Sequence, residues 1–581
     1  WEKKKFVLST EWVITIDRLV KYVGEESAKP ILEEVIKNER QVAEWEAYNL
    51  VQEAPTYDSL RSQGKWLKLS IDSIYFDSNF KQLLLTALSG SIDISYKIDG
   101  LVINSDNYHG INHILDTDQK SIQCIHIDPP YNTATSGFVY KNAYKNSSWL
   151  SMMDNRLRLS LDLLKDTASY HVHIDENEYE SLHYLFNNYN LYNAGPIIWD
   201  KRNPMNGGSG VATQHEYIIW RTVDNHIIFV RNKNTLEMIK KVEELIQAEG
   251  GINESVRKKF SSWVNSNKSL SGGEQSYRFI DAEGRIYRGI SLRAPERRID
   301  EKFHQPLIHP ITKRPCAMPP NGFSRTPETL KDMMENGEIL FGKDETTQPQ
   351  WKKILTKKSQ KQFSSLIQDG KKGKADIKHM GFEFPYCHPT SLYEELIGSS
   401  EVADGDVVLD FFAGSGTTFH TIQNLNREDN LKRKCILIEQ GHYTTTTIIP
   451  RIKKIAYTFD WKEGKPKDDS MNGLGVFFKY QRLEQYEEAL ENIAFNASED
   501  AVQKSLEFDQ YIPKYFLEFE TKGSQTLVNT TYMKDPWDYK LKVWDGFTYD
   551  NEQAVDLVET FNYLIGLHMQ KCITKELNDK K

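Results

Sequence analysis

Residues 406–418 read D-V-V-L-D-F-F-A-G-S-G-T-T, and they are the strongest indication of the fold class. A short apolar run, V-V-L, ends in Asp410, and the turn that follows contains Gly414 and Gly416 and leads into a predicted helix. Glycine permits positive φ and has no Cβ, so a ligand can approach the backbone of such a turn. A strand, a glycine turn and a helix in this order are typical of a doubly wound α/β sheet, whose ligands bind at the carboxyl ends of the strands.

The turn is expected to bind a nucleoside cofactor without a phosphate chain. Position 419 is Phe where the dinucleotide fingerprint has its third glycine, and no G-K-[ST] is present to hold a triphosphate. Glu439 ends the next predicted strand, K-C-I-L-I-E, 29 residues after Asp410. A carboxylate at this position is suited to bond the two hydroxyls of a ribose.

A second motif, D-P-P-Y at 128–131, follows the apolar-rich run S-I-Q-C-I-H-I. Two prolines hold the chain extended and remove two N–H donors, so carbonyls are the main-chain groups left for hydrogen bonding. Asp128 adds two acceptor oxygens, and Tyr131 offers a flat face beside them. Such a loop is suited to an amino group on an aromatic plane, as in adenine or cytosine. The alternative is a proline-rich turn that only ends a strand.

The chain is long enough for several domains. Between about 98 and 230 short apolar runs alternate with helix-like stretches, and the Leu-rich segment N-R-L-R-L-S-L-D-L-L-K is expected to be a helix. Between 236 and 380 this alternation gives way to Gly, Pro, Ser and charge. We therefore expect a mainly helical region at 1–75, a catalytic domain at 76–235 and 381–470, an insertion at 236–380, and a helical interface region at 471–581.

The composition further limits the kind of protein that this chain can be. Apolar residues make up 39% and charged residues 27% of the 581 residues, as in a soluble globular protein. No run approaches the roughly 20 apolar residues of a membrane span, so the cytoplasm is the expected compartment. The five cysteines are far apart, which argues against structural zinc and disulfides, and no metal is expected. The chain begins with Trp1 and is expected to be a fragment or a trimmed sequence.

Together the two motifs resemble those of a known family. D-P-P-Y-N-T and F-A-G-S-G-T-T are similar to motifs IV and I of the DNA amino-methyltransferases that use S-adenosylmethionine, in the order of the β class. D-G-L-V-I-N-S-D-N-Y, Y-H-V-H-I-D-E-N-E and H-E-Y-I-I-W resemble further segments of that family. H-P-I-T-K-R-P-C-A-M-P-P-N-G-F, I-L-F-G-K-D and V-E-T-F-N-Y-L-I-G-L are similar to the modification (Mod) subunits of type III restriction-modification systems.

The resemblance implies methyl transfer from S-adenosylmethionine to adenine N6 in double-stranded DNA by base flipping. It implies a Rossmann-like methyltransferase sheet with an inserted target-recognition domain, a homodimer, and a partner restriction subunit with helicase and nuclease functions. The expected catalytic loop is Asp128, Pro129, Pro130 and Tyr131. The expected cofactor contacts are Asp410, Phe412, Gly414, Gly416, Thr417, Glu439, Asp106 and His388. His388 stands where the family often has Lys, and Ser105 replaces a common Gly, so the contacts to the methionine half are open.

Residues 351–378 contain nine lysines against two aspartates, a density that attracts phosphates. The expected DNA-binding residues are Lys352, Lys353, Lys357, Lys358, Lys371, Lys372 and Lys374.

Three alternatives remain at this point. Methylation of cytosine N4 uses the same geometry, but that motif commonly begins with Ser, so Asp128 favours adenine. If the chain were a Rossmann oxidoreductase, the D-P-P-Y motif would have no role. If the chain were a non-catalytic DNA-recognition subunit, neither D-P-P-Y nor the glycine turn would have a role.

Overall fold

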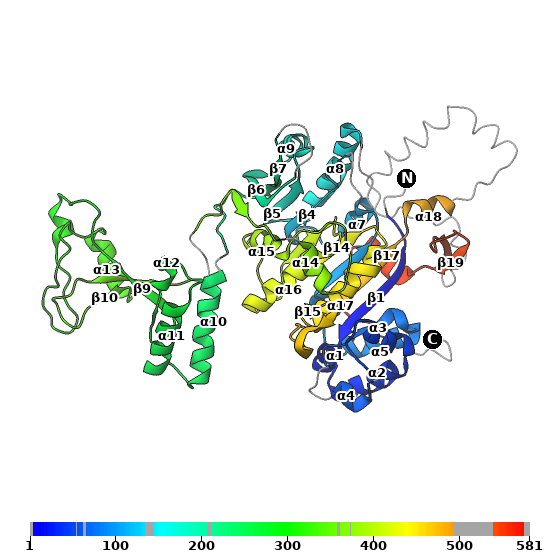
Figure 1. The fold of residues 1–581 in the computed structure, drawn as a ribbon, viewed down its shortest axis with the longest axis horizontal. Coiled ribbons are helices and arrows are strands. Elements are labelled where there is room, and N and C mark those ends of the chain that lie inside the picture. The colour runs from blue at the N-terminus through cyan, green and yellow to red at the C-terminus, as the bar shows by residue number, and fades with distance from the viewer. Residues whose placement is uncertain are drawn as a thin grey trace. The chain divides into compact units, whose positions relative to one another are not determined.

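The computed structural model describes residues 4–53, 55–61, 66–133, 144–205, 211–231, 233–356, 361–371, 373–492 and 539–573. Its contacts divide the chain into two compact units (Figure 1). Unit 1 comprises Trp1–Ile228 with Phe363–Lys581, and unit 2 comprises Phe229–Gln362. Within the described residues, no helix is both long enough and apolar enough to cross a membrane.

Unit 1 is built on one eleven-stranded sheet. In spatial order its strands are β12 (Leu366–Gln368), β6 (Tyr192–Met205), β7 (Thr213–Thr222), β5 (Leu164–Ile174), β4 (Ile122–Ile127), β13 (Val407–Asp410), β14 (Lys434–Glu439), β3 (Gly100–Asn104), β17 (Phe477–Leu483), β1 (Val7–Thr15) and β2 (Ser70–Asp72). The six strands from β5 to β17 in this order are parallel to one another. This confirms the predicted doubly wound, mostly parallel sheet.

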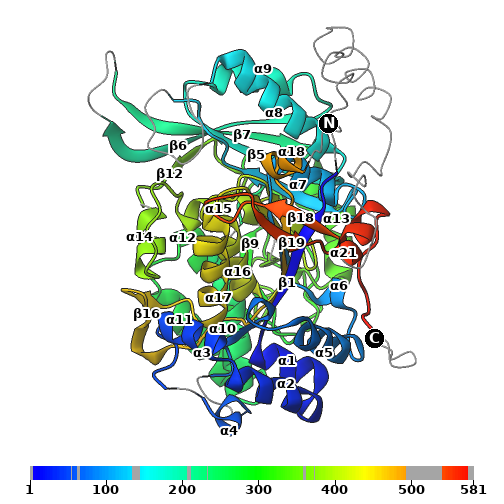
Figure 2. The ribbon, with the colours of Figure 1, turned by 90° about the vertical axis from the view of Figure 1, so that its right-hand side faces the viewer.

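Both faces of the sheet are buried, which explains why its central strands are almost continuously apolar. Successive residues point to opposite faces, so Val408 belongs to one core and Leu409 to the other. The core with Leu409 is covered by α7 (Asn107–Ile114), α8 (Asn146–Leu161) and α9 (Tyr179–Phe186). The Leu-rich segment predicted as a helix lies in α8 as far as Leu161, and its last two residues begin β5. The core with Val408 is covered by α15 (Thr390–Gly398), α16 (Thr417–Asp429) and α17 (Ile449–Tyr457) (Figures 1 and 2).

The N-terminal region contains several helices, as expected, but both ends of the chain also contribute strands to the main sheet. The N-terminal segment contains α1 (Ile16–Val23), α2 (Glu25–Lys37), α3 (Glu39–Ala47) and α4 (Tyr57–Arg61), and α5 (Ser78–Ser89) follows, but β1 and β2 extend the main sheet. The C-terminal segment supplies β17, which lies between β3 and β1. It also contains α18 (Tyr486–Glu491), the hairpin of β18 (Lys540–Val543) and β19 (Asn551–Ala554), and α21 (Leu557–Leu564). The β-branched residues of β1 and the aromatic residues of β17 favour strands.

A buried ion cluster ties the N-terminal segment to the sheet. Lys453 of α17 has a side chain that is 2% exposed, and its Nζ lies 2.6 Å from Asp72 Oδ2 and also contacts Glu44. The hydroxyl of Tyr480 donates to Asp72 Oδ1 at 2.9 Å. The two buried carboxylates are thus held by one ammonium group and a phenol.

Unit 2 has its own small cores. It contains α10 (Lys233–Ala248), α11 (Glu254–Ser266), α12 (Gly272–Gln275) and α13 (Pro327–Glu335). Its antiparallel sheet has the order β10 (Ile339–Leu340), β11 (Gln350–Ile354), β9 (Ile286–Ser291) and β8 (Phe279–Ile280). The unit ends before the expected boundary at 380, because β12 pairs with β6 in unit 1 and α14 (Gly373–His379) follows it there.

Candidate active site

Three acidic residues meet at the carboxyl edge of the parallel strands. Asp410 ends β13, Glu439 ends β14, and Asp128 directly follows β4, which pairs with β13. The register sets Asp410 beside Leu437 and Glu439 beside Asn104. The D-P-P-Y loop and the glycine turn, which are far apart in the sequence, are therefore neighbours at one end of the sheet.

The glycine turn has the backbone that its sequence predicts. Gly414 and Gly416 have φ of +53° and +77°, in the left-handed region that favours glycine. Gly416 precedes α16, so the turn delivers the chain directly to the first turn of that helix. A side chain at either position would be strained by the backbone alone.

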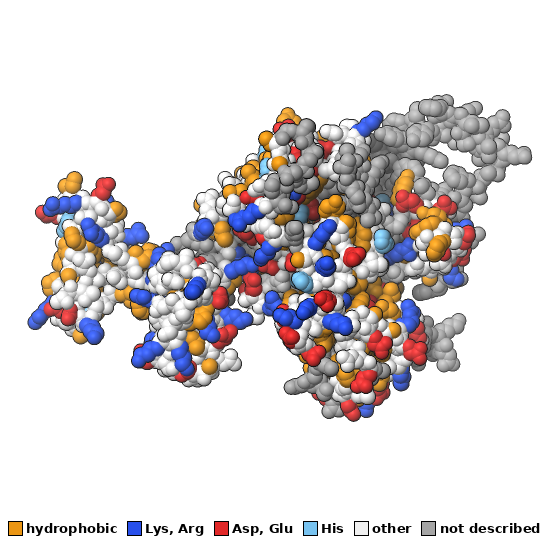
Figure 3. All heavy atoms as spheres, viewed as in Figure 1, with side chains coloured by type: hydrophobic (Ala, Val, Ile, Leu, Met, Phe, Trp, Pro, Cys, Tyr) orange, Lys and Arg blue, Asp and Glu red, His pale blue; other side chains and the backbone are white. Residues whose placement is uncertain are grey.

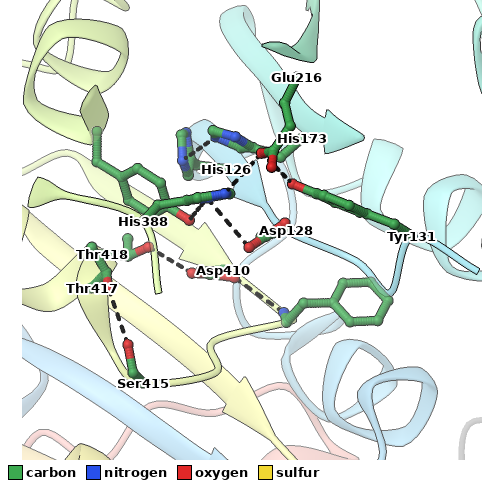
Figure 4. A network of polar contacts seen from close by, with 12 residues as sticks. His126, Asp128, Tyr131, His173, Glu216, His388, Asp410, Ser415, Thr417 and Thr418 are labelled. Atoms are coloured by element: carbon green, nitrogen blue, oxygen red, sulfur yellow. Dashed lines mark hydrogen bonds and ion pairs between the residues drawn. The ribbon is translucent and has the colours of Figure 1, made fainter. Parts of the chain in front are cut away.

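Asp410 lies behind this turn and holds its shape. Its Oδ1 accepts the N–H of Phe412 at 3.1 Å, and its Oδ2 accepts the hydroxyl of Thr418 at 2.6 Å (Figure 4). Burial raises the pKa of Asp410 to about 7, although these hydrogen bonds act in the opposite direction. Both oxygens thus accept hydrogen bonds from the turn and the helix that follows it, and a direct contact of Asp410 with the cofactor stays a prediction.

Glu439 faces a pocket beside the turn. Its two oxygens accept the N–H groups of Gly414 and Gly441, each at 2.9 Å. The pocket has a volume of about 480 Å³, which includes space open to solvent. Its lining is Asp106, Asn107, Pro130, Tyr144, Met152, Arg156, Phe411, Phe412, Glu439 and Gln440. Three predicted cofactor residues, Asp106, Phe412 and Glu439, therefore share one cavity with Pro130 of the D-P-P-Y loop.

A buried arginine supports the glycine turn from the other side. Arg451 of α17 is 2% exposed, and its Nη1 donates to the Ser415 carbonyl at 3.0 Å and to the Thr417 hydroxyl at 3.2 Å. Its Nε has no hydrogen-bond partner, and it forms no ion pair with a described residue. Burial lowers the pKa of Arg451 to about 10, so the group is still charged at neutral pH. An unneutralised guanidinium beside the N-terminus of α16 favours a nearby anion.

The D-P-P-Y loop is anchored on both sides. The indole N–H of Trp149 donates to the Pro130 carbonyl at 2.8 Å, and the Tyr131 hydroxyl donates to Glu216 Oε2 at 3.1 Å. Asn132, with φ of +59°, donates to Glu178 Oε1 at 2.6 Å. These bonds fix the direction in which Asp128 leaves the end of β4.

Asp128 belongs to a polar network with His388 and Glu216. His388 Nδ1 lies 3.3 Å from Asp128 Oδ2, and its Nε2 lies 3.1 Å from Glu216 Oε2 (Figure 4). Lys201 Nζ is 2.7 Å from Glu216 Oε1. Desolvation raises the pKa of Asp128, and His388 opposes that rise. His388 is thus beside the D-P-P-Y loop and is not among the residues that line the pocket.

A family model described as DNA methylase matches residues 122–449, which include both motifs and unit 2. This match covers more than half of the 581 residues. The chain belongs to the DNA methylase family. The resemblance drawn from D-P-P-Y and F-A-G-S-G-T-T is thereby confirmed.

Several curated proteins are similar to this DNA methylase. The Mod subunit of the type III restriction-modification enzyme EcoP15I from Escherichia coli is 29% identical over 385 residues, which are 58% of each chain. The StyLTI Mod subunit from Salmonella typhimurium is 26% identical over 58% of this chain and 52% of its own. The type II methyltransferase M.KpnI from Klebsiella pneumoniae is 23% identical over 65% of this chain and 89% of its own. The chain thus spans between a half and three fifths of the length of these two Mod subunits.

The solved structures that match part of this chain include the cytosine-N4-specific PvuII DNA methyltransferase. It is 13% identical, covers 62% of this chain and 89% of its own, and has a TM-score of 0.31. The structure of the M1.HpyAVI complex with SAM is 14% identical, covers 61% of this chain and 98% of its own, and has a TM-score of 0.30.

The predicted DNA-binding lysines do not form one continuous segment in this DNA methylase. Lys352 and Lys353 lie on β11 of unit 2, whereas Lys371 and Lys374 follow β12 in unit 1. Lys352 is 13% exposed and pairs with Asp281 at 2.9 Å, so its charge is neutralised within unit 2. Three of the lysines, Lys357, Lys358 and Lys372, lie outside the described residues. DNA contact by this group stays a prediction.

The residues of the site that the sequence did not reveal include the charged Glu216, Arg451 and Arg156. Glu216 stands in H-E-Y-I-I-W, a segment recognised only as a strand, and Arg451 interrupts the apolar run I-I-P-R-I. Arg156 of α8 lines the pocket and lies 3.0 Å from Asp106 Oδ2. A charged residue within an apolar run was the available signal for Glu216 and Arg451.

Proposed function

We propose that this DNA methylase transfers a methyl group from S-adenosylmethionine to adenine N6 in duplex DNA, as the modification subunit of a type III restriction-modification system. The observation that carries the proposal is the placement of Asp128 and its two prolines next to the glycine turn and Glu439. One sheet edge thereby holds an acceptor-rich loop for an amino group and a pocket for a nucleoside cofactor. The test is incubation with methyl-labelled S-adenosylmethionine and duplex DNA, followed by separation of the nucleosides; label in methyladenosine is expected, and unlabelled DNA would overturn the proposal.

The residues of the pocket fit S-adenosylmethionine. Glu439 supplies acceptor oxygens suited to ribose hydroxyls, and Phe411 and Phe412 supply apolar surface for a purine. The charged Arg451 behind the turn supplies a positive potential that suits the carboxylate of the cofactor's methionine half. The turn itself has no lysine of the kind that binds phosphates. When bound, this cofactor supplies an electrophilic methyl group on a positively charged sulfur.

Asp128 then has a defined role towards the base. The lone pair of an exocyclic amine is delocalised into the ring, so the amine is a weak nucleophile. An acceptor at Asp128 and the neighbouring Pro129 carbonyl hold its hydrogens and direct the lone pair towards the methyl donor. Catalysis on this scheme consists of alignment and electrostatic preorganisation. The base must leave the duplex to reach the loop, with the ring of Tyr131 as the stacking surface.

Glu439→Gln is expected to weaken binding of S-adenosylmethionine by about 10- to 100-fold. The loss of a charged acceptor costs roughly 1.5–3 kcal/mol, and the amide would also place an N–H group near the Gly414 or Gly441 N–H. Calorimetric titration measures the affinity, with the exposed Glu463→Gln as the matched control. Equal affinity for both variants and the unchanged chain would remove Glu439 from the cofactor site.

Unit 2 supports the assignment of DNA as the substrate. Residues 229–362 contain 25 Lys and Arg against 17 Asp and Glu, a net charge of +8, although the whole chain has −9. Lys and Arg side chains are spread over the face of unit 2 that Figure 3 shows. A basic unit inserted into an acidic chain is typical of a nucleic-acid surface. We therefore propose that unit 2 is the target-recognition domain.

The joint replacement of Arg293, Arg297 and Arg298 by Ala is expected to weaken DNA binding for all sequences. These three side chains are exposed on unit 2. Each lost phosphate contact lowers the slope of log affinity against log salt by about 0.9. Fluorescence anisotropy over a salt series measures this slope, and replacement of the exposed Lys21, Lys29 and Lys37 in unit 1 is the control. An unchanged slope for the arginine variant would place the DNA elsewhere.

We also propose a homodimer and a separate restriction subunit. One side of α21 carries exposed apolar side chains. Val558 and Phe561 of this helix are 67% and 60% exposed, and Ile565, which directly follows it, is 48% exposed. Their spacing places all three on the same side. An exposed apolar stripe of this kind is typical of a protein interface. The names of the Mod relatives, which are subunits of restriction-modification enzymes, support the second partner.

A further inference from the structure

His388 is held between two carboxylates that come from different strands. Its Nδ1 faces Asp128 after β4 at 3.3 Å, and its Nε2 faces Glu216 of β7 at 3.1 Å. The side chain is 12% exposed, and His388 itself immediately precedes Pro389, the N-cap of α15. Both ring nitrogens thus point at acceptors, as Figure 4 shows.

Two carboxylates within 4 Å of the ring favour its charged form. A neutral imidazole can donate from Nε2 to Glu216 and accept at Nδ1 from the Tyr393 hydroxyl, but it carries no charge to balance the two carboxylates. The imidazolium donates from Nε2 to Glu216 and lies 3.3 Å from Asp128 Oδ2, so one cation faces both carboxylates. Within the described residues, His388 is the one basic side chain within 4 Å of the Asp128 carboxylate.

The other groups around His388 belong to three elements. Tyr393 of α15 has its hydroxyl 3.3 Å from Nδ1, the ring of His173 in β5 lies 4.7 Å away, and the ring of Trp199 in β6 lies 5.1 Å away. Lys201 of β6 faces the far oxygen of Glu216. Burial and Lys201 lower the pKa of His388, but Asp128 and Glu216 outweigh them and raise it above the ordinary 6.5. The imidazolium is therefore retained to a higher pH than in an ordinary histidine.

We propose that His388 is a positioning residue for methyl transfer: as an imidazolium it fixes the Asp128 carboxylate against Glu216, and methyl transfer declines at alkaline pH when it loses its proton. The proposal rests on the proposed function, because Asp128 is taken as the acceptor for the amino group. His388 does not touch the reacting atoms. It acts by holding Asp128 ionised and correctly aimed.

The test compares a permanent cation with a neutral side chain. His388→Lys keeps a positive charge to about pH 10, whereas His388→Gln has none. We expect His388→Gln to lower kcat by about 10-fold or more over the whole pH range, with cofactor affinity changed by less than about 3-fold. The unchanged chain should lose activity on the alkaline side, and His388→Lys should keep it there. His226→Gln is the matched control, since His226 pairs with Asp224 at 2.9 Å outside this network.

Two results would overturn the proposal. One is a His388→Gln variant with the kcat and the alkaline decline of the unchanged chain. The other is a His388→Lys variant that loses activity at the same alkaline pH as the unchanged chain. Both require an active enzyme, so a second measurement is independent of the proposed function.

That measurement is the NMR titration of the His388 ring nitrogens, assigned by their disappearance in His388→Gln. We expect a pKa above 6.5 in the unchanged chain and a lower pKa in Asp128→Asn. Titration of His388 at the same pKa in both proteins would contradict the coupling even if no DNA substrate were found. A coupled titration together with a chain that methylates no DNA would instead overturn only the proposed function.

Discussion

Asp128→Ala is expected to lower the rate of methyl transfer to duplex DNA by roughly 10²- to 10³-fold, while S-adenosylmethionine still binds. The reason is that Asp128 follows β4 beside the pocket but is not among its lining residues. Removing the carboxylate takes away the acceptor for the amino group and leaves the glycine turn and Glu439 intact. Single-turnover kinetics with labelled cofactor measure the rate, and calorimetric titration measures the affinity.

Asp128→Asn is the graded comparison for this prediction. Asparagine keeps one acceptor oxygen at the same distance from the backbone, so its activity should lie between those of Asp128→Ala and the unchanged chain. Labelling of DNA by Asp128→Ala at the normal rate would remove Asp128 from the mechanism. A parallel loss of cofactor affinity would show that the variant damages the pocket and not the acceptor alone.

Lys453→Met is expected to reduce the free energy of unfolding by about 3–5 kcal/mol. Lys453 lies between Asp72 and Glu44, and its removal leaves two buried carboxylates without a cation. A loss of this size is a large fraction of the roughly 5–15 kcal/mol that stabilises a typical domain. Urea unfolding followed by circular dichroism measures the change.

Arg158→Met is the control for that measurement. Arg158 pairs with Asp154 at 2.8 Å on the surface of α8, where its side chain is 60% exposed. Exposed pairs contribute little, so the unfolding midpoint of this variant should stay close to that of the unchanged chain. Equal midpoints for Lys453→Met and Arg158→Met would mean that the buried cluster does not hold the N-terminal segment.

Local motifs made the central part of the fold predictable. The run V-V-L-D with its glycine turn and the run K-C-I-L-I-E predict two parallel strands whose carboxyl ends lie side by side, and this places Glu439 next to the turn. The terminal strands were missed because helical spacing dominates residues 16–51. The shorter alternation V-L-S-T-E-W-V-I-T at 7–15 was given too little weight.

The network around Asp128 depends on contacts that no local pattern contains. Glu216 and His388 are 172 residues apart, and only the pairing of β5 with β7 brings Glu216 to the same edge as Asp128. His388 was expected near the methionine half of the cofactor because a motif suggested it, whereas its two ring nitrogens face carboxylates. Arg451 was missed because an arginine in a helix is usually exposed.

The most direct test of the central claim is sequencing of DNA from a methylation-free bacterial host that expresses this chain, with direct detection of modified bases. We predict N6-methyladenine at one short sequence motif in the DNA of cells that express the unchanged chain, and its loss in cells that express Asp128→Ala. N4-methylcytosine at a motif, or N6-methyladenine that persists in Asp128→Ala, would contradict it.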